Sequence, residues 1–182
     1  MQASLAAGLV AGLMTLAAPA LAAGPADCSS GPMANASRTD GYSLKRILRI
    51  AGLTADGQLV CLDDRKPGKV RMVGSINGLS GDTRLVGIDY RPQDGLLYGV
   101  GDAGGLYRVD TDTAVATMVG QLKDAMGVPI ALVGTRFGVD FNPAANALRI
   151  VSDAGQNLRQ SFGNLGTGNP LAATAVDMPL VG

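Results

Sequence analysis

From residue 42 onward, the hydrophobic residues fall mostly in short runs of about four to six positions, bounded by Gly, Asp, Asn and Pro. No window keeps a helical period long enough for a helix, so the runs predict β-strands joined by tight turns. The first run would also suit a short helix by its spacing, but its likeness to the later runs favours a strand. The predicted strands lie within LKRILRIAGL (44–53), GQLVCL (57–62), KVRMVGSI (69–76), RLVGIDYR (84–91), GLLYGVG (95–101), GGLYRVD (104–110) and ATMVGQL (116–122).

The chain repeats its own pattern at a spacing of about fifty residues. Beyond the matched pairs listed below, Leu106 matches Leu158 after one inserted residue, and the segments ending at Asp63 and Asp110 match at a spacing of 47. A repeat of this length with about four strands is typical of one propeller blade. The sequence therefore predicts an all-β, propeller-like fold built from blades of about four antiparallel strands. The pairs with a spacing of 51 are Gly87/Gly138, Asp89/Asp140, Pro92/Pro143, Leu97/Leu148, Val100/Val151, Asp102/Asp153 and Gly104/Gly155.

Composition supports this fold class and narrows the partners. The chain has no Glu, a strong helix former, and it has 26 Gly, which suits tight turns. Fifteen Lys and Arg balance fifteen acidic residues, all of them Asp. Without a net charge there is no long-range field to gather polyanions, so nucleic acid and anionic membrane surfaces are not expected as partners.

The N-terminal segment predicts export. Residues 1–22 contain an apolar run followed by Pro19 and the small-residue pattern Ala20-Leu21-Ala22, which is typical of a signal peptide cleaved near Ala22 or Ala23. The apolar run is shorter than the roughly 20 residues that span a bilayer, so no membrane span is expected after cleavage. We expect a flexible arm over residues 23–41, one repeat domain over residues 42–182, and a periplasmic or extracellular location.

Two cysteines, Cys28 and Cys61, are the only ones in the chain. An oxidising compartment would let them form a disulfide that ties the arm to an early strand, and we favour this pairing over two unrelated thiols.

The repeated segments LVGIDYRPQDGLLYGVGDAGGLYRVD, ATMVG and FGVDFNPAANALRIVSDAGQNLR carry a family resemblance. They resemble the domain of unknown function 4394 family of exported bacterial proteins, over about Ser43 to Asn164. The resemblance implies a propeller-like fold and no particular reaction or ligand. Members of this kind continue with further blade-like repeats, so the resemblance also implies that this chain forms an incomplete propeller with exposed sheet edges.

The absence of His excludes Ser-His-Asp and Cys-His catalysis and removes the usual neutral-pH base. Hydrolysis by two carboxylates would need Asp89 and Asp140, which occupy equivalent positions of neighbouring repeats. The same equivalence also suits a structural aspartate that accepts backbone hydrogen bonds at a strand end in every repeat. We therefore assign no catalytic and no cofactor-binding residue.

Two kinds of binding site are compatible with the polar turns. Calcium prefers hard oxygen ligands, and the candidate ligands are Asp102, Asp110, Asp112, Asp153 and Asn157, although none of them fits a twelve-residue EF-hand loop. Alternatively, arginine and amide side chains could form a polar recognition surface for carboxylates or sugars, formed by Arg149, Gln156, Asn157 and Arg159.

The sequence thus predicts an exported, non-catalytic binding or scaffold module whose partner is an extracytoplasmic protein or glycan. The alternative is a metal-dependent hydrolase or lactonase on a propeller scaffold, with the metal held by Asp and Asn. Convergence of Asp89 and Asp140 on one cavity would favour the enzyme.

Overall fold

The protein is built from β-strands and turns. The computed structural model describes residues 28, 49–64 and 66–180, so the predicted signal peptide and nearly all of the predicted arm lie outside the described residues. No helix in the described residues is long and apolar enough to cross a membrane. The predicted all-β class is confirmed. The strands of the described residues are β1 (Arg49–Leu53), β2 (Gln58–Asp63), β3 (Val70–Ser75), β4 (Leu85–Tyr90), β5 (Leu97–Gly101), β6 (Gly105–Val109), β7 (Ala116–Gln121), β8 (Phe137–Asn142), β9 (Ala147–Ser152), β10 (Asn157–Ser161) and β11 (Ala175–Val176).

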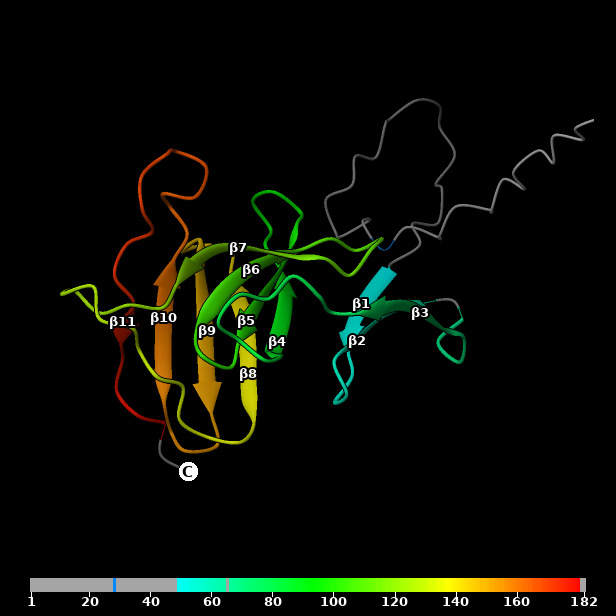
Figure 1. The fold of residues 1–182 in the computed structure, drawn as a ribbon, viewed down its shortest axis with the longest axis horizontal. Coiled ribbons are helices and arrows are strands. Elements are labelled where there is room, and N and C mark those ends of the chain that lie inside the picture. Colours follow the sequence, from blue (N-terminus) through cyan, green and yellow to red (C-terminus); the bar gives the residue numbers. More distant parts are fainter. Residues whose placement is uncertain (1–27, 29–48, 65, 181–182) are drawn as a thin grey trace, which may run out of the picture.

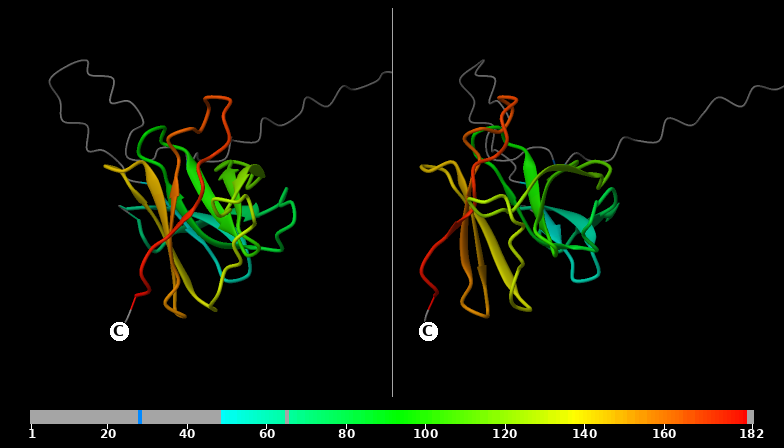
Figure 2. Two further views of the ribbon diagram at one scale, coloured as in Figure 1. Left: turned by 90° about the vertical axis from the view of Figure 1, so that its left-hand side faces the viewer. Right: turned by 60° about the vertical axis from the view of Figure 1, so that its left-hand side comes forward.

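These strands form three separate antiparallel sheets, in the orders β1-β2-β3, β4-β5-β6-β7 and β11-β10-β9-β8. In each sheet, strands that follow one another along the chain are paired, which is the meander that the spacing of the turns predicts. The sheet β4–β7 lies between the other two, as Figure 1 and the turned views of Figure 2 show. The described part of the chain is therefore a stack of three sheets.

Both faces of the middle sheet are buried, each against a different neighbour. Alternate residues point to opposite faces of a strand, so Leu97 and Tyr107 pack toward β1–β3 while Tyr98 and Leu106 pack toward β8–β11. Three aromatic rings, Tyr98, Phe141 and Phe162, meet edge to face in the second core, with centroids 5.0–5.7 Å apart. Because both faces of the middle sheet are buried, successive residues of its strands are apolar, and the strands have nearly continuous apolar runs.

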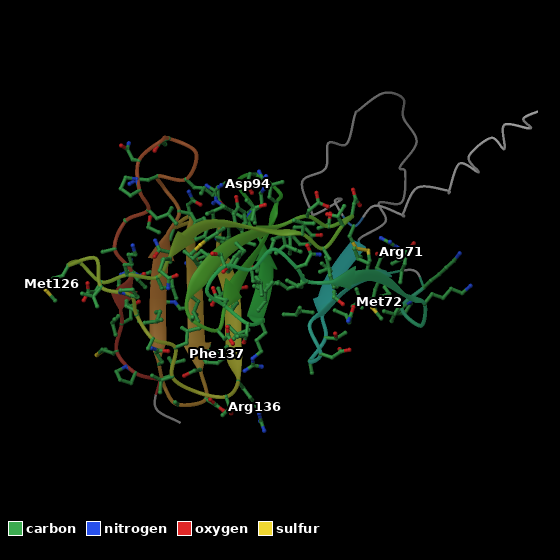
Figure 3. All side chains as sticks on the ribbon, in the orientation of Figure 1. Arg71, Met72, Asp94, Met126, Arg136 and Phe137 are labelled. Carbon is green, nitrogen blue, oxygen red and sulfur yellow. A yellow bond between two sulfur atoms is a disulfide. The ribbon has the colours of Figure 1, made fainter. Side chains whose placement is uncertain are left out.

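The two outer faces of the stack differ. On β1–β3, cross-strand pairs place Ile50 beside Leu62 and Val60 beside Met72, on the face opposite the buried core. Ile50 is 45% exposed and Met72, labelled in Figure 3, is 59% exposed. This outer face is apolar, whereas the outer face of β8–β11 carries charged and amide side chains.

The pairing of residues across the strands shows which positions of the second and third sheets are equivalent. Asp89 pairs with Tyr98 as Asp140 pairs with Arg149, and the next strand places Arg108 and Arg159 at matching positions. Equivalent residues of β6 and β10 are therefore also 51 positions apart in the sequence. The predicted match of Leu106 with Leu158 is wrong, because the ladder places Leu106 at the position of Asn157.

The predicted disulfide between Cys28 and Cys61 is present, with the two Cα atoms 5.9 Å apart. The carbonyl oxygen of Cys28 also accepts a hydrogen bond from the Tyr90 hydroxyl at 2.6 Å. In the chain-entropy model, a bridge that closes a 33-residue separation stabilises the fold by about 3 to 4 kcal/mol. The bridge thus fixes Cys28 to the first sheet and, through Tyr90, to the end of β4.

The close approach of β4 and β8 depends on Gly87. A Cβ atom at Gly87 would lie 2.9 Å from the Cβ of Val139 on β8, whereas a Cβ at the equivalent Gly138 would meet only Val151 of its own sheet, at 3.1 Å. Gly87 therefore lets the two sheets pack together, and Gly138 has no such role.

We expect Gly87→Ala to reduce the free energy of unfolding by about 1 to 3 kcal/mol, because the new methyl group overpacks the contact between the sheets. Gly138→Ala is the matched control and should have a clearly smaller effect. Urea unfolding of both variants checks this, and equal destabilisation would contradict the proposed packing of β4 against β8.

Candidate functional site

Asp89 connects the second and third sheets. Its carboxylate accepts hydrogen bonds from its neighbour's amide, Tyr90 N, at 2.8 Å and from Phe141 N on β8 at 2.7 Å. Burial raises the pKa of Asp89, and the charge of Asp140 adds to this effect, while the two amide hydrogen bonds oppose it. Asp89 and Asp140 therefore lie on β4 and β8, which belong to two different sheets. Asp89 holds these sheets together, whereas Asp140 is exposed.

Asp102 and Asp153 have the same structural task in two sheets. Each carboxylate accepts hydrogen bonds from the amide and hydroxyl of a threonine that precedes the first strand of its sheet. Asp102 contacts Thr83 in this way, and Asp153 contacts Thr135 with distances of 2.8 and 2.6 Å. Each aspartate therefore closes a turn onto the start of the first strand of its own sheet.

These contacts set the protonation of both aspartates. Partial burial raises the pKa of Asp102, but hydrogen bonds from Thr83 and Arg84 outweigh it and hold the pKa below its usual range. The hydroxyl and amide of Thr135 lower the pKa of Asp153 to about 2. Both side chains are ionised over the whole neutral range.

The remaining predicted calcium ligands lie elsewhere. Asp110 folds a tight turn after β6, where its Oδ1 accepts hydrogen bonds from Asp112 N and from the amide and hydroxyl of Thr113. Asn157 lies on β10, in the third sheet. Within the described residues, no three carboxylate or thiol side chains are grouped so that they could hold one metal ion. The structure therefore does not bring the five predicted ligands together, and calcium binding stays a prediction.

Three of the four residues predicted as a polar surface meet on the outer face of β8–β11. Arg149 donates to Asp177 Oδ2 at 2.5 Å and to Asn157 Oδ1 at 2.7 Å. Arg159 donates to the same Asp177 oxygen at 3.2 Å. Hydrogen bonds from Arg159 and then from Arg149 lower the pKa of Asp177. One carboxylate thus orients two arginines, and we call Asp140, Arg149, Asn157, Arg159 and Asp177 the outer polar face.

Gln156 does not belong to this face. Its side-chain amide donates to Ala131 O and accepts from Val133 N, both at 3.0 Å, so it fixes the segment that leads to β8. Beside the outer polar face, a groove of about 580 Å³ is lined by Arg149, Val151, Asn157, Asp177, Met178, Pro179 and Leu180.

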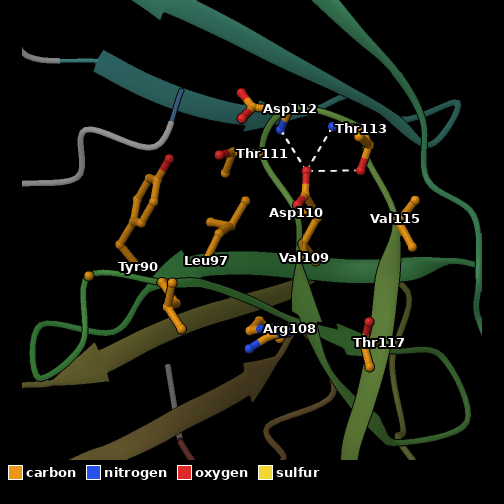
Figure 4. A pocket seen from close by; sticks show the side chains of 12 residues that line it. Tyr90, Leu97, Arg108, Val109, Asp110, Thr111, Asp112, Thr113, Val115 and Thr117 are labelled. Atoms are coloured by element: carbon orange, nitrogen blue, oxygen red, sulfur yellow. Dashed lines mark hydrogen bonds between the residues drawn. The ribbon is translucent and has the colours of Figure 1, made fainter. Parts of the chain in front are cut away.

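A second cavity, of about 480 Å³, lies where β6 runs into the turn Asp110–Thr113 (Figure 4). Arg108 and Thr117 contribute polar groups at one end of it, and they are directly opposite each other on β6 and β7. Leu96 and Val115 add exposed apolar surface, and Tyr90 lines the cavity beside Cys28.

Sequence reasoning missed Asp177, Arg108 and the two threonines. Thr83-Arg84 and Thr135-Arg136 repeat at a spacing of 52, which could have revealed the turn contacts. The assumed inserted residue before Leu158 shifted the alignment of the repeats by one position, so Arg108 was not matched with Arg159. Asp177 follows a strand of only two residues, so no periodic pattern points to it.

Comparison with known proteins gives one match. The family model described as Domain of unknown function (DUF4394) matches residues 58–181, which include every strand from β2 to β11. No curated protein and no solved structure matches the chain.

The lowered pKa values of Asp102 and Asp153 predict how the stability of the fold depends on pH in acid. A carboxylate whose pKa is lowered by folding contributes stability above its unfolded pKa of about 3.8, and this is lost as the pH falls through the folded value. We therefore expect the thermal midpoint to drop between about pH 4 and pH 2.

Asp153→Asn should flatten this part of the curve, and Asp56→Asn, at an exposed turn position, should leave it unchanged. Thermal melts at a series of pH values make the comparison. If Asp153→Asn keeps the full acid dependence, the hydrogen bonds of Thr135 do not act as described.

Proposed function

The chain belongs to the Domain of unknown function (DUF4394) family, and we propose that it is an exported, propeller-like binding module without catalytic activity. It recognises an extracytoplasmic partner through the outer polar face. The observation that carries this proposal is that two buried apolar residues of the middle sheet have polar residues at the equivalent positions of the third sheet.

On the middle sheet, Tyr98 and Leu106 are fully or almost fully buried against β8–β11. On the third sheet, the ladder places Arg149 and Asn157 at the same two positions, joined by a hydrogen bond. An apolar pair that packs against a neighbouring sheet is thus replaced by a connected polar pair. Such a face does not need apolar cover, and its polar groups remain available to a partner.

The chemistry of the face indicates what it binds. Asp140, Arg149 and Arg159 lie opposite one another across three strands, and Asp177 adds a second negative charge. The charges balance, so the face suits a polar partner without a large charge of its own. Each guanidinium has more N–H donors than its contacts here use, and these donors favour carboxylate, carbonyl or hydroxyl acceptors.

Exposed apolar residues beside the face suit an interface as well. Met178 is 86% exposed and Leu180 is 54% exposed, and both line the groove next to Arg149. Protein interfaces combine such apolar contacts with arginine and a polar rim.

Export is supported by the N-terminal sequence and by the disulfide, which persists in oxidising compartments. The alternative, a metal-dependent hydrolase or lactonase, has weaker support. Its key carboxylate, Asp89, is already used by two backbone amides, and the outlined cavities are not lined by Asp89 or Asp140.

The test is binding of the purified, secreted chain to the cell-envelope fraction of its own host, measured by co-sedimentation. The double variant Arg149→Ala, Arg159→Ala should lose binding by at least about tenfold, since it removes both charged donors of the face. Arg136→Ala, an exposed arginine labelled in Figure 3, is the control and should bind like the native chain.

Thermal melts show whether the double variant stays folded. Binding that is equal in the native chain and the double variant would refute the outer polar face as the recognition site. Sustained turnover of lactones or esters that Asp89→Asn abolishes would refute the non-catalytic function.

A further inference from the structure

We propose that the cavity at the end of β6, lined by Arg108, Asp110 and Thr117, binds a neutral sugar. This site is separate from the outer polar face and does not rest on the function proposed for it.

The argument starts from the two equivalent arginines. Arg159 is held by Asp177, with contacts of 3.2 and 3.4 Å. Arg108 occupies the matching position on β6, is exposed, and makes no hydrogen bond or ion pair within the described residues. The ligand of this cavity would therefore supply the acceptor that Asp177 supplies to Arg159.

An acceptor is also available in the same cavity. All three hydrogen bonds to Asp110 go to its Oδ1, which leaves Oδ2 without a hydrogen-bond donor within the described residues. Figure 4 shows Arg108 and Thr117 near one end of the cavity and the turn that begins at Asp110 near the other. Arg108 and Asp110 form no hydrogen bond or ion pair with each other, although the charge of Arg108 helps to lower the pKa of Asp110 after the hydrogen bonds of Thr113 and Asp112. Hydroxyl groups donate and accept at once, so they can satisfy both side chains.

Charge and shape narrow the ligand class to a neutral sugar. Arg108 and Asp110 bring one charge of each sign to the cavity, so it has no excess positive charge that would attract anionic ligands. Leu96 and Val115, which are 40% and 39% exposed, give it an apolar wall, and the carbon-bound hydrogens of a sugar ring can pack there. Its volume of about 480 Å³ lies within the usual range of small-ligand sites.

The experiment uses the full chain and a panel of neutral sugars, namely glucose, galactose, mannose and N-acetylglucosamine with their disaccharides. Saturation-transfer NMR detects binding and titration calorimetry measures it, with glucuronate and inorganic phosphate as anionic probes. We expect at least one neutral sugar to bind in the millimolar range or tighter, and we expect neither anion to compete with it.

Arg108→Gln should weaken sugar binding by at least about tenfold without moving the thermal midpoint, because an exposed side chain is changed. Arg136→Gln, at an exposed arginine outside both the cavity and the outer polar face, should leave sugar binding unchanged. The proposal is overturned if no neutral sugar binds, if an anion binds in preference, or if Arg108→Gln binds like the native chain. None of these results bears on the outer polar face, which the envelope assay tests separately.

Discussion

A sheet of three or four short strands cannot bury an apolar face by itself, and this constraint organises the described part of the molecule. The middle sheet, β4–β7, solves it on both sides, with Leu97 and Tyr107 against the first sheet and Tyr98 and Leu106 against the third. The glycine at position 87 allows the close approach to β8, and Asp89 adds two backbone hydrogen bonds at the same contact. The two outer faces of the stack differ, since the outer face of β1–β3 is apolar and the outer face of β8–β11 is polar.

Repetition and divergence have separate roles in this chain. The repeated positions, such as Asp102 and Asp153, close turns and are needed wherever such a sheet forms. The positions that break the repeat mark the places where the sheets have different surroundings. Tyr98 against Arg149 and Leu106 against Asn157 are such breaks, and both lie on the face that the middle sheet buries and the third sheet exposes. Function is more readily sought at these divergent positions than at the repeated ones.

The fold was largely predictable because its signal is local. Alternation within short runs and Gly or Asp at the turns identified β1 to β7, and the spacing of 51 added β8 to β10. The candidate site was less predictable, because side-chain partners come from different sheets and connecting segments. Asp102, Asp110 and Asp153 suggested metal ligands by residue type, yet each is a hydrogen-bonded turn residue. Arg149, Asn157 and Arg159 lie together in the structure, but Asp177, which contacts both arginines, carries no sequence signal.

The central claim is that the third sheet exposes its outer face because polar residues have replaced an apolar packing pair. Arg149→Tyr together with Asn157→Leu would restore that pair, and sedimentation velocity of this variant over a range of concentrations tests the claim most directly. The restored face should pack against the apolar outer face of β1–β3 in a second copy, so we predict concentration-dependent association beyond that of the native chain. Sedimentation identical to that of the native chain, in a variant that melts cooperatively, would contradict the account.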